Sequence, residues 1–207
     1  MGVMKDRMRR GELYIADDPE LVADHARAQA LLARYNATAH GDPERPGLLA
    51  QLLGEVGEDV IVQPPLRCDY GRHVRIGSQT FVNYDCVLLD VADITIGERC
   101  QIAPRVQLLT ATHPIDPVAR RAGWELGKPI TLGENVWLGG GVIVCPGVTV
   151  GDDTVVGAGA VVTRDLPGGV VAVGNPARVQ RAISDHDTID VPAEATQHDG
   201  RHQPRNG

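Results

Sequence analysis

Aromatic side chains are scarce in this sequence of 207 residues: Phe, Trp and Tyr make up 3% of it, although 43% of its residues are hydrophobic. A core with so few rings has to be built from small and β-branched side chains, which suits a narrow interior better than a broad sandwich. The 24 glycines agree with a chain that turns often. The length fits one large domain, or a domain with a small appendage.

Long apolar runs and an excess of positive charge are also missing. No run of about 18 apolar residues occurs, and the segment MGVMKDRMRRGELY has charges without the apolar stretch of a secretory signal. The net charge of −7 argues against nucleic acid or an anionic membrane as a partner. We therefore expect a soluble, cytoplasmic protein that has neither nucleic acid nor a membrane as its partner.

Cysteine is rare, with four residues that form no C-x-x-C pair and no zinc-finger spacing. Disulfides or a metal site would require closer or more regular spacing. We expect buried free thiols.

A six-residue repeat is the main feature of the sequence. From Leu132 the hexads read LGENVW, LGGGVI, VCPGVT, VGDDTV, VGAGAV and VTRDLP, with an aliphatic first position and a small second position every time. The same template fits IGSQTF, VNYDCV and LLDVAD from Ile76 and, after a slip of two residues, IGERCQ, IAPRVQ and LLTATH from Ile96. The repeats thus extend from Ile76 to Pro167.

A period of six matches neither an α-helix nor an alternating strand. It is typical of a chain that turns a corner every six residues, with aliphatic side chains inside and glycine, asparagine or aspartate where the backbone needs a positive φ. Three such sides, and hence three hexads, close one triangular coil. Cys68 and Cys86 are three hexads apart, so we expect them to stack as two buried thiols.

The segments on either side of the repeats differ from them. DDPELVADHARAQALLARYNATA predicts a helix that starts at Pro19 after an Asp17 or Asp18 cap, and a shorter helix is predicted for Gly47 to Leu53. From Ser184 to Gly207 the chain has no aliphatic periodicity. We expect residues 184–207 to be a disordered tail.

The repeat breaks off at His113, and the segment from Pro114 to Ile130 intervenes before it resumes near Thr131. Insertions that leave a regular wall are more often functional than structural. Transfer of an acetyl group from a thioester to an alcohol needs a base for the hydroxyl proton, and a neutral imidazole suits that role. The alternative for His113 is a corner histidine that only hydrogen-bonds the loop.

Several motifs together resemble the maltose/galactoside O-acetyltransferases: LRCDYG, FVNYDCVLLD, ATHPIDP followed by ELGKPI, NVWLGGGVIVCPGVTVGD, GAGAVVTRD and GNPAR. The resemblance runs from GELY to about Arg181. It implies an all-β fold, a left-handed parallel β-helix of hexapeptide repeats over residues 59–181 with an inserted loop at 114–130. A short N-terminal helical segment at 1–58 would serve the acceptor site.

The resemblance also implies roles for individual residues. His113 would be the general base, with Glu125 as its acidic partner and Asn83 beside it. The acceptor would be bound by Asp69, Asn83, Asp17 and Tyr14, although Asn83 also suits a positive-φ corner and Glu125 a solvated loop. Acetyl-CoA, the co-substrate, would contact Gly140, Ala158, Thr163, Arg164, Arg178 and Arg181.

The function implied is acetyl transfer from acetyl-CoA to a sugar hydroxyl, without a metal, in a homotrimer. Asp69 favours a maltose- or glucose-like acceptor, and a galactoside or a chito-oligosaccharide is the alternative. A metal-dependent hydratase on the same coil would need three clustered histidines, and the repeats hold only His73 and His113. A non-catalytic scaffold or sugar-binding module remains a further alternative, which thiol release from acetyl-CoA in the presence of sugar would distinguish.

Overall fold

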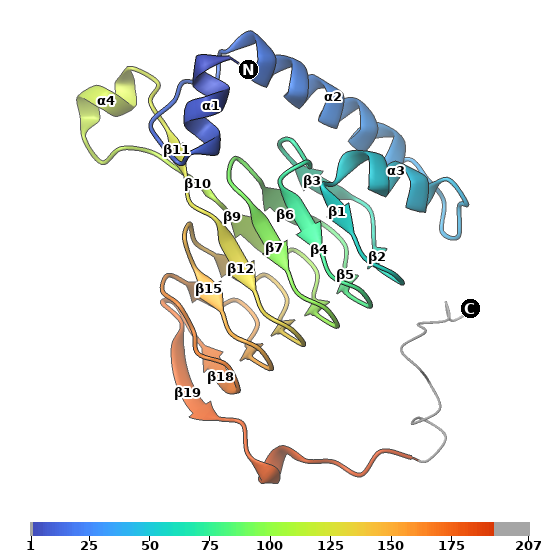
Figure 1. The fold of residues 1–207 in the computed structure, drawn as a ribbon. Coiled ribbons are helices and arrows are strands. Elements are labelled where there is room, and N and C mark those ends of the chain that lie inside the picture. Colours follow the sequence, from blue (N-terminus) through green and yellow to red (C-terminus); the bar gives the residue numbers. More distant parts are fainter. Residues whose placement is uncertain (1, 193–207) are drawn as a thin grey trace.

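The chain winds into a three-sided parallel β-helix with helices over one end, as the hexads predict (Figure 1). The computed structural model describes residues 2–192. Strands that lie one coil apart in the sequence pair in parallel, so each coil adds one strand to each of three sheets.

The first sheet has the order β1-β4-β7-β12-β15, with the strands Glu55–Val56, Val74–Ile76, Ile94–Ile96, Ile130–Leu132 and Thr149–Val150. The second has the order β19-β18-β16-β13-β8-β5-β2, with Arg178–Ala182, Val170–Val173, Val155–Val156, Trp137–Leu138, Gln101–Ile102, Phe81–Val82 and Ile61–Val62. The third has the order β17-β14-β9-β6-β3, with Val161–Val162, Ile143–Val144, Gln107–Leu109, Cys86–Leu89 and Leu66–Cys68. The first coil begins at β1, slightly before the expected boundary at residue 59.

Three helices precede the coils: α1 (Val3–Arg9), α2 (Pro19–Asn36) and α3 (Arg45–Leu52). Asp18 caps α2 by accepting a hydrogen bond from the backbone N–H of Glu20 at 2.9 Å, and Pro19 occupies the first turn, as predicted. Helix α2 packs on β3 and α3, and Figure 1 shows both helices over the first coils. Within residues 2–192, no helix is both long and apolar enough to span a bilayer.

The first and fifth hexad positions fill the interior. From Leu132 onward, the aliphatic first positions are all buried, as are Val136, Val142 and Val148 at fifth positions. Small and branched side chains suffice because the three walls lie close together, which explains the low aromatic content.

The fourth hexad position, rather than the second, carries the left-handed backbone. Positive φ occurs at Gln79, Asp85, Arg99, Arg105, Asn135 and Asp153, and at glycines in the same position of other hexads. The suggested positive-φ role of Asn83 is therefore wrong: Asp85, two residues later, takes that conformation with φ 61°.

Small residues at the second position have a different cause, the close approach of successive coils. A Cβ atom on Gly97 would lie 2.3 Å from the carbonyl oxygen of Gly133, and one on Gly139 would lie 2.6 Å from the backbone nitrogen of Ala158. A side chain at either of these two glycines would push neighbouring coils apart.

The early coils are longer than three hexads by two residues, so Cys68 and Cys86 do not stack. Leu66 pairs with Cys86, and Cys68 pairs with Leu88. Both thiols are buried and free, as expected, but they are two residues out of register. The spacing falls to three hexads only after the loop, where Thr131 pairs with Thr149.

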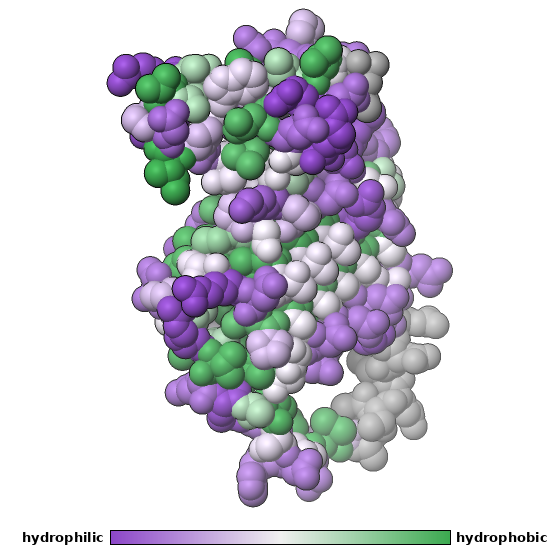
Figure 2. All heavy atoms as spheres, turned by 60° about the vertical axis from the view of Figure 1, so that its left-hand side comes forward, coloured by the Kyte–Doolittle hydropathy of each residue, from purple (hydrophilic) through white to green (hydrophobic). Residues whose placement is uncertain are grey.

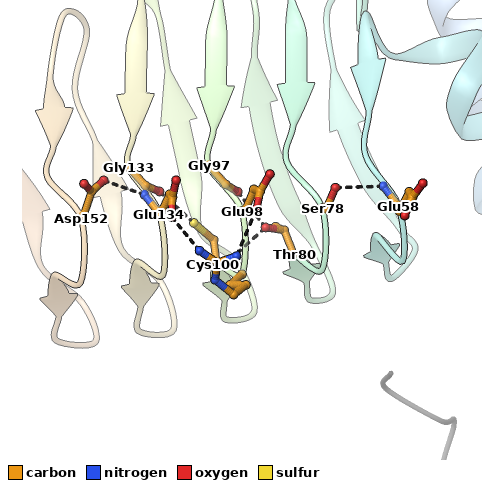
Figure 3. Close-up of polar contacts among 10 residues, drawn as sticks. Glu58, Ser78, Thr80, Gly97, Glu98, Cys100, Gly133, Glu134 and Asp152 are labelled. Carbon is orange, nitrogen blue, oxygen red and sulfur yellow. Dashed lines mark hydrogen bonds and ion pairs between the residues drawn. The ribbon is translucent and has the colours of Figure 1, made fainter. Parts of the chain in front are cut away.

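Polar contacts between coils hold the corner between the first and second sheets (Figure 3). Thr80 Oγ1 donates to the carbonyl of Gly97 at 2.8 Å and accepts from the backbone N–H of Cys100 at 3.0 Å. Further along, the Glu134 N–H donates to Asp152 at 2.8 Å. These contacts satisfy corner groups that the ladders leave unpaired.

The loop after β9 begins with β10 (Ala111–Thr112), continues through α4 (Pro117–Arg121) and returns along β11 (Leu126–Gly127). At the other end, β19 folds back antiparallel on β18. Beyond it, Asp185–Asp187 form a short 3-10 turn, and Asp187 pairs with Arg181. The expected disorder of 184–207 does not hold for the 3-10 turn at its start. Residues 193–207 of that tail lie outside the described residues.

Candidate functional site

Two edges of the three-sided prism carry the residues of interest. The edge between the third and first sheets comprises residues 69–73, 90–93, 110–129, 145–148 and 163–168, and we call it the histidine edge. The edge between the second and third sheets comprises residues 83–85, 103–105, 139–141 and 157–159, and we call it the glycine edge.

The neck of the loop places His113 opposite Glu125. Strands β10 and β11 pair antiparallel, with Ala111 opposite Gly127 and Thr112 opposite Leu126. The next pair of positions outward is His113 and Glu125, so both side chains stand where the hairpin opens.

Tyr14 fastens the N-terminal segment to the same point. Its backbone N–H donates to the carbonyl of Glu125, and the N–H of Glu125 donates to the carbonyl of Tyr14, each at 3.0 Å. The guanidinium of Arg7 also lies 5.9 Å from the centre of the Trp124 ring. The loop is thus held to the segment between α1 and α2, which lies beside it in Figure 1.

A cavity of about 400 Å³ opens at this junction, and we call it the inner cavity. Its polar lining residues are Tyr14, His25, Asp69, Tyr70, His113 and Glu125. Its apolar lining residues are Ala16, Leu21, Val22, Leu89, Val91 and Ala111. A concave site with an apolar wall and a few convergent polar groups is the usual form of a small-molecule site.

Asp90 holds the turn that brings Asp69 and Tyr70 to the inner cavity. Its buried carboxylate accepts hydrogen bonds from the backbone N–H groups of Asp69 at 3.0 Å, Tyr70 at 2.9 Å and His73 at 3.3 Å. The Nδ1–H of His73 donates to the backbone carbonyl of Asp90 at 2.7 Å. Burial raises the pKa of Asp90 to about 6, although these N–H groups lower it.

Burial and negative neighbours also shift acidic groups within the cavity. Burial raises the pKa of the Asp69 carboxyl; the charge of His25 lowers it and that of Glu125 raises it further. Burial raises the pKa of the Tyr14 hydroxyl, with a further contribution from Glu125. Tyr14 is therefore a neutral hydroxyl at physiological pH, able to donate to a ligand oxygen.

The imidazole of His113 is exposed at the mouth of the inner cavity. Among residues 2–192 it has no hydrogen-bond partner or ion pair, so both ring nitrogens are accessible. This contrasts with His73, whose ring is tied to the backbone of Asp90. The interpretation of His113 as a corner histidine bonded to the loop finds no support in these contacts.

Two predicted acceptor residues lie elsewhere. Asn83 stands on the glycine edge, where its side chain accepts a hydrogen bond from the backbone N–H of Tyr84 at 2.8 Å. Asp17 is exposed and does not line the inner cavity, whereas its neighbour Ala16 does. Asn83 and His113 therefore do not meet within one chain.

Backbone donors face outward on the glycine edge at the predicted acetyl-CoA positions. The N–H groups of Gly140 and Ala158 have no hydrogen-bond partner in the described part of the chain, although their neighbours Gly139 and Gly141 do. The two residues occupy equivalent places in successive coils, since the N–H of Gly159 donates to the carbonyl of Gly140 at 2.9 Å. A ligand along this edge would meet two aligned donors.

The other residues predicted to contact acetyl-CoA lie in two regions, the histidine edge and β19. Thr163 and Arg164 are exposed on the histidine edge, below the loop. Arg178 pairs with Val173 at the start of β19, and within residues 2–192 its guanidinium donates only to the carbonyl of Ala177, at 2.8 Å. Arg181 is engaged by Asp187 through two contacts of 2.6 Å.

Sequence reasoning missed His25 and Asp90. His25 lies on α2, where its position looked like part of an ordinary exposed helix face. Asp90 left a signal: it stands in LLDVAD, directly before the two-residue slip of the repeat. An acidic residue at that break could have been interpreted as the group that holds the enlarged corner.

Known metal centres need clustered ligands. Among residues 2–192, no group of three or more His, Cys, Asp or Glu side chains is arranged to hold a metal ion.

Two family models match the chain. The maltose acetyltransferase hexapeptide capping motif matches residues 7–57, which include the end of α1 and all of α2 and α3. The bacterial transferase hexapeptide model of six repeats matches residues 129–164.

Whole-chain comparisons agree with these matches. The chain is 51% identical to Nodulation protein L of Rhizobium meliloti (strain 1021) over 177 residues, which cover 85% of this chain and 97% of that protein. The crystal structure of a maltose O-acetyltransferase from Clostridium difficile 630 matches with a TM-score of 0.87 and 45% identity, covering 89% of this chain and 99% of that one.

A galactoside acetyltransferase in complex with coenzyme A also matches with a TM-score of 0.87, at 37% identity, covering 90% of this chain and 94% of that one. The chain belongs to the maltose and galactoside O-acetyltransferase family of hexapeptide-repeat acyltransferases.

Proposed function

We propose that this acetyl-CoA-dependent O-acetyltransferase acetylates a hydroxyl of a glucose- or maltose-like sugar, with His113 as general base. The observation that carries the proposal is the placement of His113 and Glu125 opposite each other at the neck of the loop, facing one cavity with Asp69 and Tyr14. A galactoside or a chito-oligosaccharide is the alternative acceptor.

Proton transfer is the step that His113 would perform. Acetyl-CoA supplies the acetyl group as a thioester. As the sugar oxygen bonds to the acetyl carbon, the hydroxyl proton passes to a ring nitrogen of His113, and the carbon–sulfur bond breaks. The imidazolium then returns that proton to the departing sulfur, so the imidazole ends the cycle neutral.

Glu125 would support the charged form of His113. A carboxylate opposite the imidazole stabilises the imidazolium while it holds the proton. The paired backbone hydrogen bonds to Tyr14 fix the position of Glu125, so this support does not depend on a flexible loop.

Polar and apolar groups of the inner cavity suit a pyranose ring. The Asp69 carboxylate accepts hydrogen bonds from sugar hydroxyls, and the Tyr14 hydroxyl can donate to a ring or hydroxyl oxygen. Leu21, Leu89 and Val91 offer an apolar wall for the C–H face of the ring.

A homotrimer would complete the site. The acceptor residues lie on the histidine edge, whereas Asn83, Gly140 and Ala158 lie on the glycine edge of the same prism, separated by the third sheet. Packing the glycine edge of one copy beside the histidine edge of the next would bring the residues of the two edges together. Three such contacts would close a ring of three copies. Exposed apolar side chains of the second sheet, Trp137, Val173 and Val179, fit such packing. On the face of the molecule seen in Figure 2, hydrophobic, neutral and hydrophilic residues are interspersed.

The test is thiol release from acetyl-CoA with glucose, maltose, a β-galactoside and chito-oligosaccharides as acceptors. Faster release with glucose or maltose than with the others supports the proposal. Preference for another sugar would reassign the acceptor. Sugar binding without release would favour the non-catalytic module.

A further inference from the structure

A second cavity, of about 360 Å³, adjoins the inner cavity, and we call it the outer cavity. It lies between α2 and β3 and is lined by Gln29, Leu32, Ala33 and Asn36 of the helix and by residues 66–69. His25 and Asp69 line both cavities. A ligand in the inner cavity that extends past these two side chains therefore enters the outer one.

The walls of the outer cavity are held in place by side-chain hydrogen bonds between helix and coil. Gln29 Nε2 donates to the carbonyl of Cys68 at 2.9 Å. Asn36 bonds both backbone groups of Leu66, donating to its carbonyl and accepting from its N–H, each at 2.9 Å. A preformed cavity costs little ordering entropy when a ligand binds.

The outer cavity also offers groups that suit a second sugar unit. Arg67 is exposed on β3, and its guanidinium has no hydrogen bond or ion pair among the described residues. Its neighbour Asp69 provides acceptor oxygens, while Leu32 and Ala33 provide an apolar surface. A guanidinium with free N–H donors, a carboxylate and an apolar strip suit a neutral polyhydroxyl ring, and the Asp69 carboxylate would repel an anion.

We propose that the acceptor is an oligosaccharide whose reacting unit occupies the inner cavity while the next unit occupies the outer cavity. The proposal rests on the proposed function and narrows its substrate class: the enzyme acts on a chain of at least two sugar units rather than on a free monosaccharide. His25 and Asp69 lie at the junction and would contact the linkage between the two units.

The test compares KM along two acceptor series, glucose to maltotriose and N-acetylglucosamine to its trimer, using thiol release from acetyl-CoA. For the preferred series we expect KM to fall about tenfold from one unit to two, because the second cavity adds binding that does not involve the reacting centre. Arg67→Ala should lose most of this ratio. Ala33→Trp should lose it too, since the indole would fill the outer cavity.

Ala30→Trp is the matched control, because Ala30 is exposed on the same helix and lines neither cavity. It should keep the wild-type KM ratio. Equal KM values for one and two units in both series would overturn the proposal while leaving acetyl transfer to sugars intact. A ratio that Ala33→Trp and Arg67→Ala leave unchanged would overturn it as well. Absence of transfer to any sugar would instead refute the proposed function and, with it, this inference.

Discussion

Tyr14 and Glu125 exchange two backbone hydrogen bonds of 3.0 Å, which join the N-terminal segment to the loop that carries His113. The side chain of Tyr14 packs with Met8, Leu21, Tyr70 and Val91 in a small core of its own. The helical segment therefore lines the inner cavity as well as covering the end of the β-helix. Changes in this contact should affect both folding and acceptor binding.

The first prediction concerns the Tyr14 hydroxyl, which is buried without a hydrogen-bond partner in the described part of the chain. Tyr14→Phe should change the free energy of unfolding by less than about 1 kcal/mol, because it removes an unsatisfied polar group. Tyr14→Ala should cost about 3–5 kcal/mol, because it removes the ring. Urea unfolding measures both. A loss above about 2 kcal/mol for the Phe variant would show that the hydroxyl has a partner, for which Glu125, one of the groups that raise the pKa of Tyr14, is a candidate.

The second prediction tests whether two copies build each site. His113→Ala and Asn83→Ala chains should each be nearly inactive. The first variant alters the histidine edge of every site, and the second alters the glycine edge of every site. Chains that are mixed, unfolded and refolded together in equal amounts should regain about a quarter of the wild-type sites, because one neighbouring pair in four then combines two intact edges. A mixture no more active than the separate variants would mean that Asn83 and His113 do not share a site.

The third prediction concerns the buried carboxyl of Asp90, whose pKa burial raises to about 6. A raised pKa means that the folded chain holds this proton more tightly than the unfolded chain. The contribution of Asp90 to the free energy of unfolding is therefore largest when its carboxyl is protonated. This contribution falls by on the order of 2 kcal/mol as pH rises from about 4 through about 6.

Asp90→Asn removes this titration and keeps most of the shape of the turn. The difference in unfolding free energy between wild type and variant should thus shift in favour of the variant from pH 5 to pH 7. Chemical denaturation at the two pH values measures it, and taking the difference cancels other titrating groups. A difference that does not vary with pH would contradict the assignment.

The fourth prediction separates two arginines that were expected to act alike. Arg178→Ala should raise the KM for acetyl-CoA about tenfold, because it would remove the charge-assisted contact to phosphate that the resemblance implies. Arg181→Ala should have a smaller effect, because Asp187 already engages this side chain. Steady-state kinetics at low and high salt would measure both effects, and the Arg178 effect should shrink as salt rises. Equal donor KM values for wild type and Arg178→Ala would remove Arg178 from the donor site.

The sequence was sufficient for the coils because hexad periodicity reflects a local rule. Leu132, Leu138 and Val144 point inward whatever lies far along the chain, and the second position is small wherever coils touch. Register was harder to predict. The expected stacking of Cys68 on Cys86 failed because the early coils contain two extra residues, and only the slip after LLDVAD in the sequence indicated this.

The residues of the candidate site were named from the sequence, but their arrangement was only partly predicted. His113, Glu125, Asp69 and Tyr14 come together because a hairpin and an isolated backbone bridge join distant segments, a placement that the resemblance supplied and periodicity did not. His25 was missed because the sequence of a helix indicates which side chains are exposed but does not indicate which distant segment they lie against.

The most direct test of this account is the turnover of His113→Ala with acetyl-CoA and the preferred sugar. Folding and oligomeric state should be unchanged, because the side chain is exposed and has no partner among the described residues. We expect kcat to fall by roughly 10²–10⁴, the usual contribution of a positioned base, while the KM for acetyl-CoA stays near the wild-type value. A folded variant that acetylates the sugar within about fivefold of wild type would contradict the role of His113 as the base.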